Sequence, residues 1–248
     1  MNKTKLRLSL LLLGSLALGS CSKSGGNEFT AEGTITDAAG KTLYLETTDT
    51  DEPQLIDSVT LDEKGRFRFR REAHSYPAFY RLRLGESFIP FAADSITHLT
   101  LSASGKDLFS TYTIESGDEA NKQIREIGQL RTATDKAIEA ILTQLNNGTL
   151  DRGIALARID SLSTQLKNTL TSKYIFSDPK GAAAYYALFQ SYLGGTYFSI
   201  DHPGDDRAFA AVATAYDAFH PNAPYTPLLK QAALRSIAMA RARRDPSA

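Results

Sequence analysis

The sequence is poor in cysteine, lacks tryptophan and has no surplus of either charge. Cys21 is the only cysteine in 248 residues, so neither an intrachain disulfide nor a CxxC redox motif can exist. The absence of tryptophan excludes a sugar-binding platform built from its rings, although eleven tyrosines and twelve phenylalanines remain for other aromatic surfaces. Twenty-eight basic residues balance twenty-eight acidic ones, whereas nucleic-acid-binding proteins carry a basic surplus. We therefore expect a fold held by its hydrophobic core and no nucleic-acid partner.

Residues 1–20 have the layout of a secretory signal peptide. Lys3, Lys5 and Arg7 precede an apolar run that extends from Leu8 to Leu18. This run is about half of the roughly 20 apolar residues that a membrane-spanning helix needs. We therefore expect the segment to be cleaved rather than to remain as a transmembrane helix.

The stretch Leu18-Gly19-Ser20-Cys21 resembles the lipobox of bacterial lipoproteins. The resemblance implies that the Cys21 thiol is lipidated and that Cys21 becomes the first residue of the mature protein. A diacylglyceryl thioether together with an acylated amine, with palmitate as a typical chain, would give the stable membrane anchoring that one chain cannot. The alternative is a plain secretory signal with an incidental cysteine.

The residues after Cys21 indicate where such a lipoprotein would lie. Ser22, where an aspartate would signal retention, implies delivery to the outer membrane, and Lys23 offers no acidic run of the kind associated with surface export. We expect a protein of the cell envelope, lipid-anchored in the outer membrane and facing the periplasm. Residues 21–27 are small and polar enough to form a flexible tether.

Residues 28–117 show the alternation of β-strands, and we expect an antiparallel β-sandwich or open barrel there. In one segment Phe67 and Phe69 share a face while Arg66, Arg68 and Arg70 share the other, which predicts a half-buried strand. Strands are expected at residues 29–35, 41–47, 55–62, 65–70, 78–84 and 98–103.

Residues 118–248 change to helical periodicity, with apolar residues recurring at intervals of three and four. Asn147-Gly148 separates the first two expected helices, and Asp178-Pro179 and Gly194-Gly195 mark the start and end of a third. A fourth is expected at 205–219, and a fifth runs from Thr226-Pro227 to near Arg244. The fold class expected is therefore α+β, with the β-sandwich followed by an antiparallel helical bundle.

Catalytic and metal-binding motifs are hard to find in this sequence. His74, His98, His202 and His220 stand apart, with none of the spacings of a zinc site, and there is neither a G-x-S-x-G motif nor a glycine-rich phosphate loop. The segment 201–206 combines His202 with Asp201, Asp205 and Asp206, but aspartate ahead of a helix more often caps the backbone. We expect no catalytic residue, no metal and no cofactor.

The arginines of two expected strands form a candidate anion-binding patch. If the two strands paired with their arginines on one face, five guanidinium groups would suit phosphate or carboxylate groups of the envelope. The alternative is a solvated face whose charges pair with Glu46, Asp57 or Glu72. The five residues are Arg66, Arg68, Arg70, Arg81 and Arg83.

Several segments between residues 33 and 121 resemble the domain-of-unknown-function 4369 family. They are GTITDAAGKTLYLE, IDSVTLDEKGRFRFR, PAFYRLRL and YTIESGDEAN, and the helical segment that begins at Asp178-Pro179 resembles the linker region of the same lipoproteins. In that family these parts commonly precede a thioredoxin-like domain of membrane-tethered thiol–disulfide oxidoreductases. The sequence stops at Ala248, where such a domain would begin, so the resemblance transfers no redox function.

Two hypotheses follow for the function. The first is a non-catalytic lipoprotein that binds a partner protein or an envelope ligand at the periplasmic face. The second is a non-catalytic partner or remnant of the oxidoreductases, which acts by docking to a separate thioredoxin-fold protein. An enzyme built on the 201–206 segment is a weaker third.

Overall fold

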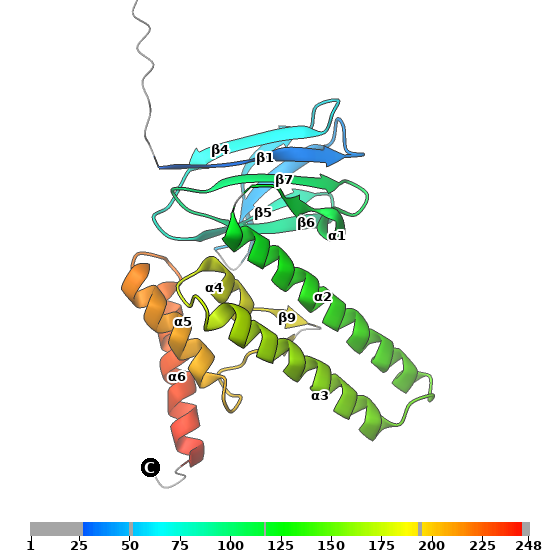
Figure 1. The fold of residues 1–248 in the computed structure, drawn as a ribbon, viewed down its shortest axis with the longest axis vertical. Coiled ribbons are helices and arrows are strands. Elements are labelled where there is room, and N and C mark those ends of the chain that lie inside the picture. Colours follow the sequence, from blue (N-terminus) through cyan, green and yellow to red (C-terminus); the bar gives the residue numbers. More distant parts are fainter. Residues whose placement is uncertain (1–26, 50–51, 117, 193–194, 245–248) are drawn as a thin grey trace, which may run out of the picture.

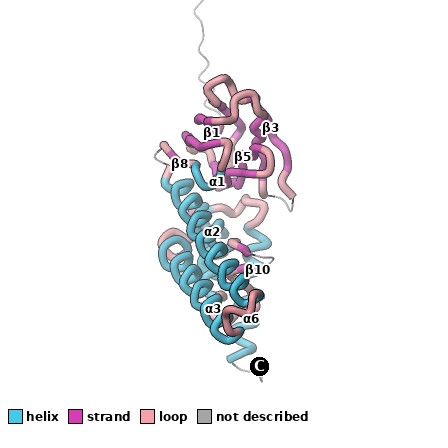
Figure 2. Tube along the Cα trace, turned by 90° about the vertical axis from the view of Figure 1, so that its right-hand side faces the viewer, coloured by secondary structure: helices cyan, strands magenta, loops and turns pink. Residues whose placement is uncertain are grey.

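The computed structural model describes residues 27–49, 52–116, 118–192 and 195–244 of an α+β protein. The strands of the two large sheets lie at one end of the molecule and the long helices at the other (Figures 1 and 2). The predicted fold class, with strands first and helices after them, is thus confirmed. Cys21, the predicted leader and nearly all of the predicted tether fall outside the described residues.

Eight strands and one short helix make up the N-terminal part of the described chain. In chain order they are β1 (Glu28–Thr36), β2 (Thr42–Thr47), β3 (Gln54–Thr60), β4 (Arg66–Glu72), β5 (Ala78–Leu84), β6 (Ser87–Ala93), β7 (His98–Ser104), α1 (Leu108–Thr111) and β8 (Thr113–Ile114). They form two four-stranded sheets, with strand orders β4-β1-β7-β8 and β3-β2-β5-β6.

The first of these sheets is mixed, which corrects the prediction that all strands pair antiparallel. β1 pairs antiparallel with β4 but parallel with β7, with Thr30 opposite His98 and Thr36 opposite Ser104. A parallel pair needs a long connection, and here five strands intervene between the two partners. Alternation along a strand predicts its buried face but carries no information on the direction of its neighbours.

One hydrophobic cluster is shared by the two sheets. Phe67 and Phe69 of β4 are buried in it, as their alternation with arginine predicts, and the second sheet contributes residues such as Leu45 and Leu82. Burial of this apolar surface is the main stabilisation of a part that has no disulfide among its described residues.

Strand β6 was not predicted from the sequence, because its apolar and polar residues do not alternate and because it contains Pro90. Proline is tolerated there because β6 is an edge strand. The open side of β6 is met by Asn121 of the first long helix: the backbone N–H of Ala92 donates to the Asn121 side-chain oxygen at 2.8 Å, and the Asn121 amide donates to the Ala92 carbonyl at 2.8 Å. A side chain thus takes the place of a neighbouring strand at this point of the sheet edge.

Most of the described chain after residue 117 is helical. The elements are α2 (Glu119–Asn146), α3 (Arg152–Thr169), the π-helical η1 (Leu170–Ile175), α4 (Ala182–Leu188), the paired strands β9 (Ser191–Tyr192) and β10 (Gly195–Thr196), α5 (Asp206–Phe219) and α6 (Thr226–Arg244). α2 and α3 lie side by side, as do α5 and α6 (Figure 1).

Two of the long helices begin at capping residues. Asp118 and Asp151 accept the backbone N–H groups of Asn121 and Ile154, and so cap α2 and α3. The helix expected at Asp178-Pro179 begins instead at Ala182, after a turn in which the Gly181 N–H donates to the Asp178 carbonyl, and it ends at Leu188. The prediction for this third helix was therefore wrong at both ends.

The helices have their own hydrophobic cluster, and it extends to the sheet. Phe79 of β5 and Ala92 of β6 belong to the helical cluster, in contact with residues of α4 and of the segment before α6. The junction between β5, β6 and the helices is consequently packed from both sides.

No helix in the described part of the chain is both long enough and apolar enough to cross a membrane.

Candidate functional site

The five arginines of the predicted anion-binding patch lie on two different sheets. β4, which holds Arg66, Arg68 and Arg70, pairs with β1, whereas β5, which holds Arg81 and Arg83, pairs with β2 and β6. The premise that the two arginine strands are neighbours was wrong, because β4 follows β3 in sequence but joins the other sheet. The structure therefore does not bring the five guanidinium groups together.

Arg66, Arg68 and Arg70 of β4 are each paired with a carboxylate on the solvent-exposed face of the sheet. Arg66 contacts Asp62 at 2.7 Å and Arg68 contacts Glu32 at 3.3 Å, while Arg70 pairs with Glu28. Exposed pairs of this kind contribute little stability. The carboxylates nevertheless neutralise the positive charge of the arginines, which is what would attract an anion.

Arg81 and Arg83 share one carboxylate, that of Glu46 on β2. Arg81 Nε lies 2.5 Å from one Glu46 oxygen and Arg83 Nε 2.7 Å from the other, and Glu46 is buried. Burial alone would raise the pKa of Glu46, but the hydrogen bonds and charges of the two arginines outweigh it and lower that pKa. This cluster matches the alternative in which Glu46 pairs with the arginines across the strands.

The segment 201–206 holds a buried ion pair. The Asp205 carboxylate lies 2.7 Å from Lys167 Nζ of α3 and accepts the Ser199 backbone N–H at 2.9 Å. It makes no side-chain hydrogen bond to the first turn of α5, so the expected capping role of Asp205 was wrong. The carboxylate instead fastens the segment before α5 to α3, while His202 lies at the exposed edge, 3.7 Å from Asp205.

The histidines lie far apart in the described part of the structure. Within the described residues no three of the side chains His, Cys, Asp and Glu are grouped so that they could hold a metal ion. His74 stacks on Tyr76, His98 bonds to Thr30, and His220 Nε2 lies 3.0 Å from the Lys180 carbonyl oxygen.

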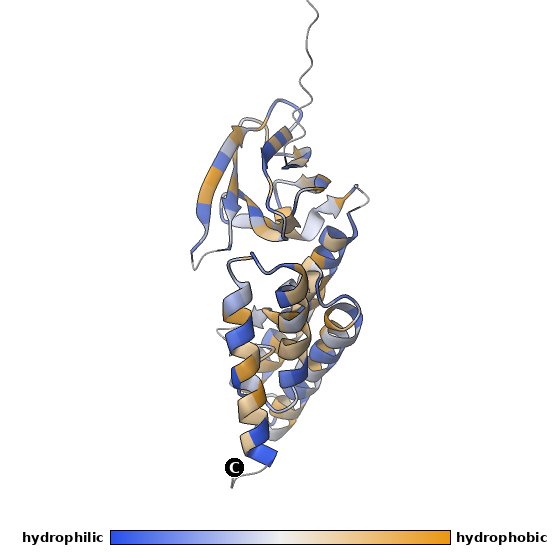
Figure 3. Ribbon diagram, turned by 90° about the vertical axis from the view of Figure 1, so that its left-hand side faces the viewer, coloured by the Kyte–Doolittle hydropathy of each residue, from blue (hydrophilic) through white to orange (hydrophobic). Residues whose placement is uncertain are grey.

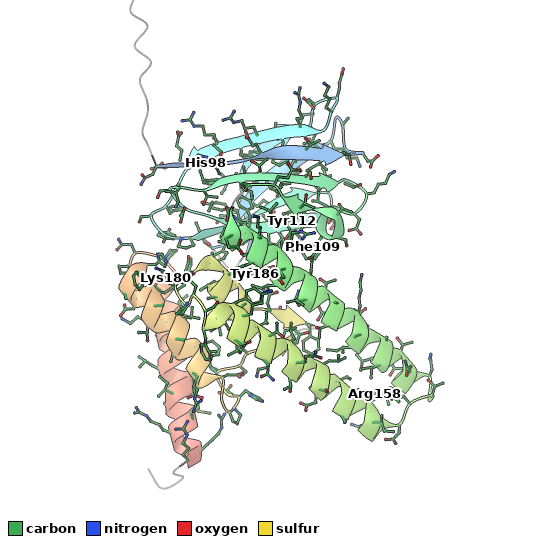
Figure 4. The ribbon with its side chains drawn as sticks, viewed as in Figure 1. His98, Phe109, Tyr112, Arg158, Lys180 and Tyr186 are labelled. Carbon is green, nitrogen blue, oxygen red and sulfur yellow. The ribbon has the colours of Figure 1, made fainter. Side chains whose placement is uncertain are left out.

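A cavity of about 240 Å³ lies where the second sheet meets the helices. Seven of its twelve lining residues are aromatic, and they come from strands β5 and β6, from α4 and its C-terminal end, and from the turn before α6. The lining consists of Thr48, Asp49, Phe79, Tyr80, Pro90, Phe91, Ile124, Tyr185, Tyr186, Phe189, Gln190 and Tyr225. Figure 4 shows Tyr186 in the angle between α2 and α4. We call this space the junction cavity.

Aromatic rings pack against one another around the junction cavity. Tyr185 is central: its ring centroid lies 5.0 Å from that of Phe79, 4.6 Å from that of Tyr225 and 4.7 Å from that of Phe189. The Tyr225 hydroxyl donates to the Pro77 carbonyl just before β5, which fixes the ring to the sheet. The wall is thus built from the strand part and the helical part together.

Asp49 is the ionisable carboxylate of this lining. Its Oδ1 atom accepts the Phe79 backbone N–H at 2.8 Å, and the adjacent Thr48 N–H donates to the Phe79 carbonyl at 2.9 Å, so the segment after β2 is tied to the start of β5. Burial raises the pKa of Asp49, partly offset by the hydrogen bond from Phe79 and by the charge of His74. Among the residues described, Asp49 makes no ion pair.

The charge of Asp49 also acts on the tyrosines around it. Burial raises the pKa of Tyr185 to about 12, and the negative charge of Asp49 adds to that shift. The same two causes, with burial the larger, raise the pKa values of Tyr80 and Tyr225. All three phenols are therefore neutral at physiological pH.

Comparison with family models, curated proteins and solved structures found no match to this chain.

No pattern in the sequence indicated the junction cavity. Asp49 follows a strand in a segment that looks like an ordinary acidic turn, and Tyr185, in the third expected helix, stands 40 residues before Tyr225, which precedes the fifth. Only the packing of the helices on β5 and β6 brings them together. The abundance of tyrosine and phenylalanine was the one available indication, and it did not point to particular residues.

Proposed function

We propose that this protein is a non-catalytic binding module of the cell envelope, that it is anchored by lipid at Cys21, and that the junction cavity is its ligand-binding site. The observation on which this proposal depends is the aromatic lining, contributed by strands and helices and containing a single carboxylate, that of Asp49. Concave, mostly apolar sites with few polar groups are typical of small-ligand binding.

The other polar clusters support a binding role over catalysis. Glu46 is held by two arginines and Asp205 by Lys167, so the two buried carboxylates with the strongest partners serve as structural ion pairs. A general acid or base needs access to a substrate and a tuned pKa, and neither cluster borders the junction cavity. As scaffold we propose that the two sheets pack as a sandwich and that the helices form an antiparallel bundle.

The ligand-binding part of the proposal can be tested by photo-crosslinking in native envelopes. A benzophenone amino acid in place of Phe189 would stand at the cavity, and the same probe in place of Phe176 gives a matched control, because the two side chains are 46% and 49% exposed and Phe176 does not line the cavity. We expect an adduct of defined mass only from position 189. Identical adducts from both positions, or none from position 189, would contradict the proposal.

The anchoring part is tested separately by the mass of the mature protein. We expect an N-terminal Cys21 that carries acyl chains, and loss of membrane attachment in the Cys21→Ser variant. A free Cys21 thiol or an uncleaved leader would show that the lipoprotein interpretation is wrong.

The second candidate function is docking to a thioredoxin-fold protein, and the outer surface of α6 favours it. Leu228, Leu234 and Met239 are exposed along this helix, and Figure 3 shows apolar colour on several of its turns. Leu228 and Met239 lie about three turns apart on one side of the helix, and a continuous exposed apolar strip is typical of an interaction surface. Replacement of Leu228 and Met239 by glutamine should abolish co-purification of such a partner, and unchanged co-purification would contradict this function.

A further inference from the structure

We propose that the junction cavity selects a small organic cation, with an ammonium group held by Asp49 and enclosed by aromatic ring faces. This inference rests on the proposed function of the cavity and adds the chemical class of the ligand. The occupant to which we commit is a free small molecule, an ammonium group on a short aliphatic body.

The size of the cavity suits such a ligand. Its volume of about 240 Å³ exceeds the roughly 150 Å³ in which an apolar cavity can hold a benzene molecule. The cavity is bounded on one side by Phe79 and Phe91 of the sheet and on the other by Tyr185, Tyr186 and Phe189 from the helical part. A compact ligand can therefore contact rings contributed by both parts.

Aromatic ring faces carry partial negative charge, and they attract cations within about 6 Å of the ring centroid. Seven of the twelve lining residues are aromatic, and they come from the sheet as well as from the helical part. A cation in the cavity would therefore lie close to several rings at once. An anion at the same place would be repelled by them.

The charge of the lining points the same way. Asp49 is its single carboxylate, and none of the twelve lining residues is lysine, arginine or histidine. Asp49 uses Oδ1 for the Phe79 N–H and has no ion pair with a described residue, while the nearby His74 stacks on Tyr76 and does not line the cavity. The cavity thus has a negative charge without a cationic side chain in its wall, and an ammonium ligand would supply the missing charge.

The experiment compares two ligands that differ in charge but hardly in shape. Choline and its uncharged carbon isostere, 3,3-dimethylbutan-1-ol, are titrated by calorimetry into the full mature protein in detergent. We expect choline to bind about tenfold more tightly, the difference that cation–π contacts in a desolvated site can supply. Equal affinities for the two ligands would overturn the proposed selectivity for charge.

Three variants assign the effect to the cavity. Asp49→Asn keeps an oxygen for the Phe79 N–H but removes the charge, so we expect about a tenfold loss of choline affinity and no change for the isostere. Phe189→Leu keeps an apolar side chain but removes a ring, and should weaken choline binding a few-fold. Asp160→Asn, on the exposed surface of α3, is the matched control and should change neither affinity.

The outcomes separate this inference from the proposed function. If neither ligand binds while the probe at position 189 still gives its adduct, the cavity binds a ligand but the cationic class is wrong. If neither ligand binds and no adduct forms, both proposals fail. Binding of vesicles that contain phosphatidylcholine, without binding of free choline, would overturn the assignment to a free small molecule.

Discussion

Replacement of Asn121 by alanine should weaken the connection between the second sheet and the helices. The Asn121 side chain is 2% exposed, and it bonds to both the N–H and the carbonyl of Ala92 on the edge strand β6. A third hydrogen bond, from the Asn121 amide to Asp118 at 2.7 Å, holds the side chain in place at the start of α2.

The expected magnitude follows from the groups that would lose their partners. Asn121→Ala leaves the Ala92 N–H and carbonyl without hydrogen-bond partners, and each buried polar group left unpaired costs about 1–3 kcal/mol. The better helix propensity of alanine recovers about half a kcal/mol. We therefore expect the free energy of unfolding to fall by about 3 kcal/mol.

Urea unfolding followed by circular dichroism measures this change. Asn168→Ala is the matched control, because Asn168 is exposed on α3 and its side chain has no hydrogen bond described; a change within about 0.5 kcal/mol is expected there. If Asn121→Ala were as mild as the control, the bridge to Ala92 would have no energetic role and our account of the junction would be wrong.

Three further predictions concern ionisable groups. Asp49→Asn should raise the melting temperature at neutral pH, because burial raises the pKa of Asp49 and its ionised form therefore destabilises the fold. The difference in melting temperature between the variant and the unmodified protein should vanish as the pH falls below about 4, where Asp49 is protonated in both the folded and the unfolded state. Glu46→Gln should lower the free energy of unfolding at pH 7 by about 2 kcal/mol in urea titrations, and this loss should shrink as the pH falls below about 4, because the arginines lower the pKa of Glu46 only in the folded state. Burial raises the pKa of Tyr185 to about 12, so its neutral form contributes stability that is complete below the unfolded value of about 10 and is lost as the pH rises through 12. The difference in tyrosinate absorbance between the unmodified protein and the Tyr185→Phe variant should therefore rise together with unfolding.

Each of these predictions has an outcome that would contradict it. A destabilised Asp49→Asn variant at neutral pH would mean that the charge of Asp49 is compensated in the folded protein. For Glu46 the control is Glu28, the half-buried partner of Arg70, and an equal effect of Glu28→Gln would contradict a special role of the buried cluster. If the absorbance difference between the unmodified protein and Tyr185→Phe rose well before unfolding, Tyr185 would be in contact with solvent.

The parts of the fold that depend on local pattern could be predicted from the sequence. Alternation along β4 correctly placed Phe67 and Phe69 inside, and the period of three and four correctly indicated the long helices on either side of Asn147-Gly148. The strand β6 was missed, since an edge strand with Pro90 needs neither alternation nor a full set of N–H groups.

The parts that depend on distant partners could not be predicted. Whether Arg68 and Arg81 share a face depends on which sheet each strand joins, and that is decided by the pairing of β4 with β1. The junction cavity likewise combines Asp49, Tyr185 and Tyr225 from three separate segments. Asp205 was assigned to a cap because sequence shows the helix start but not Lys167, which lies on another helix.

The position of β1 between β4 and β7 bears on how the protein is made. β1, the first strand of the described chain, obtains its parallel partner only after His98, 68 residues beyond Thr30, has been made. Until then β1 has unpaired hydrogen-bonding groups on that side, and chains in this condition are prone to aggregation. Chaperones that shield extended segments would therefore matter most during this interval, before the mixed sheet closes.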